Sequence, residues 1–400
     1  MQDTTINARG LNFDAVHAAL QRYVDGNLLA GVSSAVLVGR ELVDLHCAGW
    51  ADKEAATPLR LDHLFRAFSN TKLVTSIAVL LLWEEGRFAL DDAIDPFIAQ
   101  LAHRQVLRPG AVNLHDTEAA RSAITIRQLL THSSGLSYGL LDPGTMMFKA
   151  YNERRMLNPN ATLAAMMDAL ADLPLLFHPG TGWEYSVATD VLSRLVEVAS
   201  GQAFDVFIRT RILQPLGMVD TGFMVPLEEQ HRLTAYYAGA NVAEPMKPGL
   251  TRINDAPYPQ AYRRPFPRLS GGGGLVTSLP DMLALLRSLL PGGPTLLKPA
   301  TIALMMGNHL PPGQCIRFPI EGTIAGKGFG LGGCVTLAPT SAEPAQATGE
   351  FQWGGIAGTH WWISPQHNLA GLLMTQRQMG FWHPYSFEFK QRVYRAVLGA

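Results

Sequence analysis

Cysteine is scarce in this chain of 400 residues. The three cysteines, Cys47, Cys315 and Cys334, are far apart in the sequence. Their spacing excludes a disulfide framework and matches no zinc-binding pattern. The first residues show neither the charged segment nor the apolar segment of a secretory leader. We therefore expect a protein of the reducing cytoplasm.

Charge is also sparse, and long apolar runs are absent. Charged residues make up 16% of the chain, and 32 basic residues face 33 acidic ones for a net charge of −1. A nucleic-acid-binding surface needs a basic stripe, so that class of partner is not expected. The longest apolar stretch, near Ile77, is too short to cross a bilayer, so we expect no membrane span. None of the 12 histidines falls in a metal-ligand spacing, so we expect neither a metal nor an organic cofactor.

Hydrophobic residues make up 47% of the chain, which is enough for a large core. Strand signals lie at both ends, in residues 32–38, 42–47, 330–337, 359–363 and 369–376. Helical signals lie between them and at the termini, in residues 13–23, 126–130, 187–199, 282–290 and 387–398. Residues 245–267 contain six prolines, which predicts a loop rather than a helix or a central strand.

This pattern predicts an α+β fold of the α/β-sandwich kind. One antiparallel sheet built from both termini is flanked by helices, and a mainly helical domain is inserted in the middle. We place the α/β domain at residues 1–80 and 260–400 and the helical domain at residues 81–259. The active site is expected in the cleft between them.

The first candidate for chemistry is the tetrapeptide S-N-T-K at Ser69 to Lys72, which precedes a nearly apolar helix. Residues i and i+3 share a helix face, so the Ser69 hydroxyl is expected near the Lys72 amine. A buried lysine has a lowered pKa and can accept a proton from a serine nucleophile. Ser69 would also lie at the helix N-terminus, where free N–H groups favour negative charge. The alternative is a helix cap followed by a surface lysine.

Two further segments carry candidate groups. Tyr185, in Y-S-V, follows a Pro-Gly turn at the start of a helix. Beside Lys72 its phenol would have a lowered pKa and act as a base for Ser69, although a lone tyrosine is more often a core residue. In W-G-G-I at residues 353–356, two glycines let the backbone approach a ligand and present an N–H to an oxyanion. The alternative there is a glycine-rich bulge on an edge strand.

The order S-x-x-K, Y-S-x and a late glycine turn resembles the superfamily of serine β-lactamases, penicillin-binding proteins and family VIII carboxylesterases. The resemblance extends from about residue 13 to about residue 395 and includes residues 65–72, 129–136, 213–218, 272–275 and 328–332. It implies Ser69 as the nucleophile, with Lys72 and Tyr185 as the base system. The N–H groups of Ser69 and Ile356 would form the oxyanion hole.

The departures from that pattern favour an esterase. Val187 stands where such β-lactamases usually have an asparagine, and Trp353 where they usually have a lysine. With Gly354 and Gly355, these two residues would contact substrate. The resemblance therefore implies a serine hydrolase that cleaves esters of short to medium acyl groups through an acyl-enzyme. The alternatives are a β-lactamase or D-alanyl peptidase type of amidohydrolase, an acyltransferase with the same acyl-enzyme, and a catalytically silent binding protein.

One motif competes for the nucleophile. Residues 135–139 read G-L-S-Y-G, which fits the nucleophile elbow of α/β-hydrolases around Ser137. That elbow needs a strand before the serine, whereas residues 126–130 indicate a helix. We therefore favour Ser69.

Overall fold

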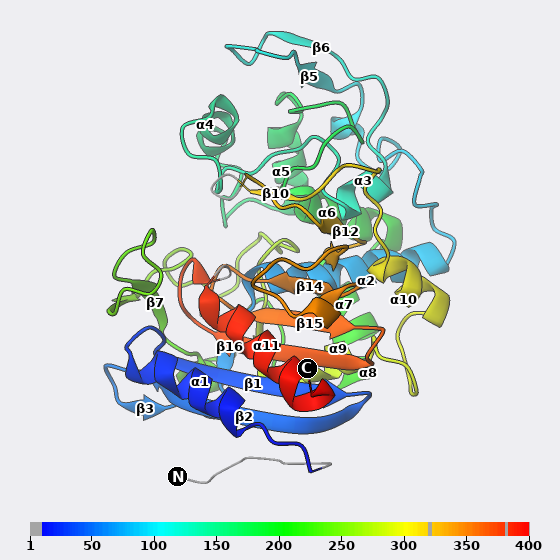
Figure 1. Ribbon diagram of the computed structural model, residues 1–400. Coiled ribbons are helices and arrows are strands. Elements are labelled where there is room, and N and C mark those ends of the chain that lie inside the picture. The colour runs from blue at the N-terminus through cyan, green and yellow to red at the C-terminus, as the bar shows by residue number, and fades with distance from the viewer. Residues whose placement is uncertain (1–9, 319–321, 381–382, 400) are drawn as a thin grey trace.

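A computed structural model describes residues 10–318, 322–380 and 383–399. Its main feature is an eight-stranded antiparallel sheet in the order β12-β13-β14-β15-β16-β1-β2-β3 (Figure 1). The strands are β1 (Gly31–Val38), β2 (Glu41–Asp52), β3 (Thr57–Pro58), β12 (Lys327–Phe329), β13 (Cys334–Thr336), β14 (Phe351–Gly354), β15 (His360–Ser364) and β16 (Leu369–Thr375). The pairing of β1 with β16 joins the two ends of the chain, with Val32 opposite Thr375. The predicted fold class, a sheet from both termini, is confirmed.

Two terminal helices cover one face of the sheet. They are α1 (Asp14–Asp25) and α11 (Pro384–Leu398), which pack on each other in front of the strands in Figure 1. Alternation along the strands explains this face: Val32 and Val36 of β1 and Trp362 and Leu373 of β15 and β16 point toward the helices. The strands predicted at residues 32–38 and 42–47 are both present and pair as a hairpin, and Gly39 makes its turn with φ of +61°.

The other face of the sheet contacts α9 (Leu279–Arg287), and the long helix α2 (Thr71–Glu84) packs on the helices beyond it. Residues Thr71 to Leu82 of α2 are all buried, as the apolar sequence predicts. The remaining helices are α3 (Ile126–Leu130), α4 (Met146–Glu153), α5 (Leu163–Leu170), α6 (Ala188–Ser200), α7 (Phe204–Ile208), α8 (Gln214–Leu216) and α10 (Pro299–Met306). Short helical turns complete the set: η1 (Phe68–Asn70), η2 (Ala99–Leu101), η3 (Arg209–Leu213), η4 (Leu227–Arg232) and η5 (Ala345–Ala347).

Local signals explain where these helices begin. The Thr125 hydroxyl oxygen accepts a hydrogen bond from the Gln128 N–H, and the Thr125 N–H donates one to Gln128 Oε1, which makes a capping box before α3. Thr162 caps α5 with a single hydrogen bond, which its hydroxyl oxygen accepts from the Ala165 N–H. In Figure 1 helices α3 to α6 lie above the sheet. The boundaries of the inserted helical domain stay a prediction.

Four short strand pairs lie outside the large sheet: β4 (Leu64–Arg66) with β9 (Val276–Ser278), β5 (Gln105–Leu107) with β6 (Thr117–Ala119), β7 (Tyr236–Gly239) with β8 (Leu250–Ile253), and β10 (Arg317–Phe318) with β11 (Gly322–Thr323). Strand β8 corrects the prediction that residues 245–267 form a loop throughout. It lies between the prolines, and its only partner among the described strands is β7. Such a short edge pairing tolerates nearby proline.

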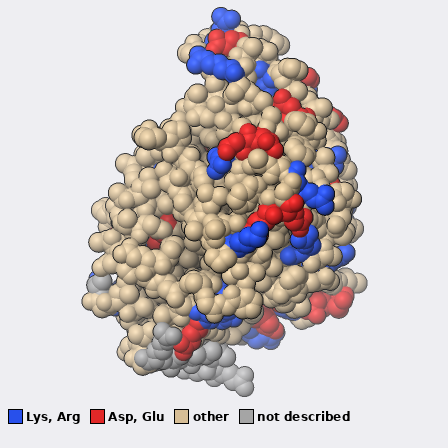
Figure 2. All heavy atoms as spheres, turned by 90° about the vertical axis from the view of Figure 1, so that its right-hand side faces the viewer, with Lys and Arg blue, Asp and Glu red and all other residues tan. Residues whose placement is uncertain are grey.

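The charges on the surface are mixed. On the face shown in Figure 2, lysine and arginine lie beside aspartate and glutamate, and a broad area carries neither. None of the described helices is both long and apolar enough to span a membrane.

Candidate active site

Ser69 lies in η1, the turn that leads into α2, and it is half-buried. The residue before it, Phe68, has φ of +43°, a backbone conformation that side chains other than glycine rarely adopt. Strained backbone of this kind persists where surrounding structure imposes it, and it gathers at functional sites. The strained turn presents Ser69 at the wall of the cavity rather than in the body of the helix.

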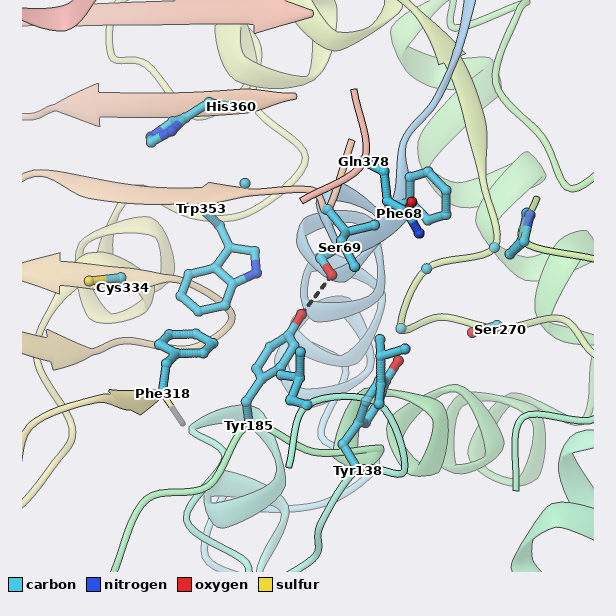
Figure 3. A pocket seen from close by; sticks show the side chains of 18 of the residues that line it. Phe68, Ser69, Tyr138, Tyr185, Ser270, Phe318, Cys334, Trp353, His360 and Gln378 are labelled. Atoms are coloured by element: carbon cyan, nitrogen blue, oxygen red, sulfur yellow. Dashed lines mark hydrogen bonds between the residues drawn. The ribbon is translucent and has the colours of Figure 1, made fainter. Parts of the chain in front are cut away.

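Tyr185 reaches Ser69 from the loop before α6. Its phenol oxygen donates a hydrogen bond to Ser69 Oγ over 2.7 Å (Figure 3). Aromatic rings surround the phenol: His132 at 4.9 Å, Trp353 at 5.4 Å and Phe318 at 5.8 Å between ring centroids. Burial raises the pKa of Tyr185, whereas the sequence led us to expect a lowered pKa beside Lys72. Tyr185 is therefore a neutral phenol at rest.

Lys72 is 1% exposed, one residue into α2. Its Nζ donates a hydrogen bond to the carbonyl oxygen of Gly272 over 2.6 Å and lies 4.6 Å from the centre of the Tyr185 ring. The shared helix face predicted a direct approach to Ser69; in the structure the hydrogen bond goes to Gly272, and Tyr185 is the group that contacts both residues. Burial lowers the pKa of the Lys72 ammonium, as expected.

The late glycine turn forms the opposite wall. Trp353 lies in β14 and its side chain is largely buried, with 9% of the residue exposed. The centre of its ring is 5.2 Å from the centre of the Phe329 ring. Gly354 and Ile356 line the cavity together with Trp353 and Ser69. The Ile356 N–H donates no hydrogen bond to a described residue. Its placement fits an oxyanion hole.

Two of the four residues predicted to contact substrate, Gly355 and Val187, do not lie at the cavity surface. Neither belongs to the described lining of the cavity. A Cβ on Gly355 would lie 2.6 Å from Ala67 O, so glycine is needed there for close backbone packing. Val187 is fully buried as the residue before α6, and its N–H donates to Ser137 O over 3.2 Å.

The cavity has a volume of about 480 Å³, within the range of small-molecule sites. Several of its walls are apolar, and Figure 3 shows Trp353 and Phe318 on one side of Ser69 and Tyr138 below it. The apolar lining includes Phe68, Leu140, Leu141, Leu157, Ile316, Phe318 and Ile324. Besides the charged residues Asp255, Lys327 and Glu343, the lining contains the polar residues Arg268 and Ser270. The argument from sequence missed these two residues and Tyr138, although the run of four glycines at 271–274 signals close approach of backbone.

A family model described as Beta-lactamase matches residues 16–383. The chain belongs to this family. Protein Rv1367c of Mycobacterium tuberculosis is 33% identical over 375 residues, covering 92% of this chain and 90% of that protein. Esterase EstB of Burkholderia gladioli is 30% identical over 379 residues, covering 92% and 91%. A solved structure titled EstCE1, a hydrolase with promiscuous acyltransferase activity, matches with a TM-score of 0.80 and 26% identity, covering 95% of this chain and 97% of that one.

Ser137, the competing candidate for the nucleophile, does not lie in the strand–turn–helix arrangement of a nucleophile elbow. Ser137 is 3% exposed and lies in a loop after α3, whereas an elbow needs a preceding strand. The Ser137 backbone N–H donates a hydrogen bond to the Tyr151 phenol oxygen over 3.0 Å. Among the described residues, no group of three or more histidine, cysteine, aspartate or glutamate side chains is placed to hold a metal ion.

Proposed function

We propose that this member of the β-lactamase family is a carboxylesterase of the family VIII kind that works through an acyl-enzyme on Ser69. The observation that carries the proposal is the contact chain from Ser69 Oγ to the Tyr185 phenol at 2.7 Å and from the Tyr185 ring to Lys72 Nζ at 4.6 Å. A serine hydroxyl is a weak nucleophile until a neighbouring group takes its proton. Here a neutral phenol contacts the serine hydroxyl, and a lysine with a lowered pKa lies against the ring of that phenol.

In the first half of the reaction, Ser69 Oγ forms a bond to the ester carbonyl carbon, and the serine proton passes to the pair formed by Tyr185 and Lys72. The carbonyl electron pair moves onto oxygen, which the N–H groups of Ser69 and Ile356 would stabilise. The carbon–oxygen bond to the alcohol then breaks, and the pair returns the proton to the departing alkoxide. Water repeats these steps on the acyl-enzyme, and the carboxylic acid leaves.

The substrate side of the proposal rests on the cavity walls. Trp353 presents an indole where the related β-lactamases usually have lysine, and Leu140, Leu157 and Phe318 add apolar surface. Such walls favour neutral acyl and alcohol groups of short to medium length. They offer no lysine at the Trp353 position for the carboxylate of a penicillin. The similarity to esterase EstB supports the same substrate class.

Acyl transfer is a second candidate, favoured by the similarity to EstCE1, whose title records promiscuous acyltransferase activity. An alcohol that enters the apolar cavity would replace water at the acyl-enzyme. The product would then be a new ester instead of an acid. Product analysis in water with and without added alcohol separates the two outcomes.

The deciding experiment compares Ser69→Ala with Ser137→Ala on p-nitrophenyl butyrate, with intact-protein mass spectrometry for the acyl adduct. We expect Ser69→Ala to lose turnover and adduct together. Ser137→Ala, a matched removal of one hydroxyl, should keep the adduct on Ser69. An active Ser69→Ala variant, or faster cleavage of penicillin than of the ester by the unmodified protein, would contradict the proposal.

A further inference from the structure

Asp190, in the first turn of α6, is a fully buried carboxylate next to the candidate base. Its Oδ1 accepts hydrogen bonds from Ser270 Oγ over 2.6 Å and from Arg268 Nη2 over 3.3 Å. Its Oδ2 is also buried and accepts no hydrogen bond from a described residue. Because buried charged oxygens are normally paired, this free oxygen calls for an explanation.

Gly272 lies between that oxygen and Lys72. A Cβ on Gly272 would be 2.7 Å from Asp190 Oδ2 and 3.6 Å from Lys72 Nζ, and Nζ already donates to the Gly272 carbonyl oxygen over 2.6 Å. The missing side chain therefore leaves the carboxylate and the amine on either side of the same small space. Glycine at this position keeps the two groups within electrostatic reach of each other.

The groups around Lys72 differ in charge. Asp190 is the acidic group, and it raises the pKa of Lys72, as the Tyr138 phenol does; Arg268 lowers it. Tyr185 faces Lys72 with its ring as a neutral phenol. The fifth neighbour, His132, is also neutral, because burial and the Lys72 charge hold its pKa well below 6.5.

We propose that Asp190 is a positioning residue that receives the Lys72 ammonium once Lys72 has taken the serine proton, and that Ser270 and Arg268 fix this carboxylate. The inference rests on the proposed esterase function. When Lys72 becomes cationic, its charge has a buried partner across Gly272 and need not remain uncompensated. Arg268 donates a hydrogen bond to the same carboxylate, and its positive charge lowers the pKa of Lys72. Lys72 can therefore lose its proton again in the next turnover.

The test is the pH dependence of kcat/KM for p-nitrophenyl butyrate, whose acidic limb reports the loss of a proton from the base of the free enzyme. Asp190→Asn removes the negative charge, lowers the pKa of Lys72 and should move this limb to lower pH. Arg268→Gln removes the positive charge and should move it to higher pH. An opposite charge at about 4–6 Å shifts a pKa by about 1–3 units, so we expect each limb to move by about one pH unit.

A glycine pair provides a matched control. Gly272→Ala puts a methyl group against Asp190 Oδ2 and should move the limb in the direction of Asp190→Asn. In Gly273→Ala the new methyl group meets only Phe68 backbone atoms at 3.6 to 3.8 Å, an ordinary contact, so the limb should stay at the wild-type pH.

The outcomes separate this inference from the proposed function. If the unmodified protein forms no acyl adduct on Ser69, the proposed function fails and takes the inference with it. If the adduct forms but the limbs of Asp190→Asn and Arg268→Gln coincide with the wild-type limb or move the same way, only the role of Asp190 is overturned. Should Asp190→Asn not fold, Arg268→Gln decides alone: an unmoved limb overturns the inference, and a limb at higher pH supports it.

Discussion

Removal of the Tyr185 phenol oxygen is the smallest change that breaks the contact chain at the candidate site. Tyr185→Phe deletes one atom and keeps the ring, which packs against His132, Phe318 and Trp353. The fold should therefore persist. What is lost is the 2.7 Å hydrogen bond to Ser69 Oγ, and with it the path by which the serine proton reaches the Tyr185–Lys72 pair.

The expected loss follows from the role of the pair. Positioned general acid–base groups contribute about 10²- to 10⁴-fold to rate, so Tyr185→Phe should lower kcat/KM by about 10³-fold. Lys72→Met keeps a side chain of similar length in the buried position and removes the amine. Because both residues move the same proton, the double variant should lose about as much as either single variant.

The assay is the kcat/KM for p-nitrophenyl butyrate, together with the rate at which the acyl adduct appears on Ser69. Tyr138→Phe is the matched control, since it removes a phenol oxygen from the same cavity, whereas the described side chain that hydrogen-bonds to Ser69 is Tyr185. It should stay within a few-fold of the wild-type rate. A Tyr185→Phe variant with a tenth or more of the activity, or a double loss equal to the product of the single losses, would refute a shared base system.

Three other substitutions test the surroundings of the site. Val187→Asn should cost about 1–3 kcal/mol of stability in urea unfolding, because its amide would be buried without partners, and a gain in penicillin turnover would contradict the placement of Val187 in the core. Burial raises the pKa of Glu184 to about 7 in the folded protein, above the unfolded value of about 4.5. The contribution of Glu184 to the free energy of unfolding is therefore lost as pH rises from about 5 to about 8. Glu184→Gln should therefore be more stable than the wild type at pH 8 but not at pH 5, and an equal difference at both pH values would count against this. Lys390 contacts the buried Glu350 carboxylate at 2.6 Å, so Lys390→Met leaves that carboxylate without its cation and with only the Tyr394 phenol as a charge-stabilising donor, which should cost about 3–5 kcal/mol. Adding Glu350→Gln should restore part of that stability, and no recovery would exclude charge burial as the cause.

The sequence predicted elements and their order well because local signals define them. Strand signals at residues 32–38 and 42–47 indicated β1 and β2, and a helical signal at residues 126–130 indicated α3. The three motifs also predicted which distant segments would meet, since the resemblance covers nearly the whole chain. The structure brings Ser69, Tyr185 and Trp353 to one cavity from three different parts of the fold.

Side-chain partners across long sequence separations were beyond that kind of prediction. Helical spacing alone directs Lys72 toward Ser69, whereas its hydrogen bond goes to Gly272, a residue 200 positions away. The direction of Val187 depends on the backbone turn before α6, and the motif pattern contains no information on that turn. Strand β8 was missed because its short pairing with β7 is compatible with a proline-rich sequence.

The aromatic shell around Tyr185 connects the chemistry of the site to its choice of substrate. The rings of His132, Phe318 and Trp353 pack against the Tyr185 ring, and burial raises the pKa of its phenol, which keeps Tyr185 protonated. A protonated phenol cannot be the final acceptor of the serine proton, so the proposed mechanism assigns that role to Lys72, whose pKa burial lowers. The indole that helps to bury Tyr185 also occupies the position at which a cationic side chain would engage an anionic lactam. Replacing Trp353 by lysine would therefore change the protonation of the base pair as well as the charge of the cavity, which explains why exchange of that one residue is not expected to convert an esterase of this kind into a β-lactamase.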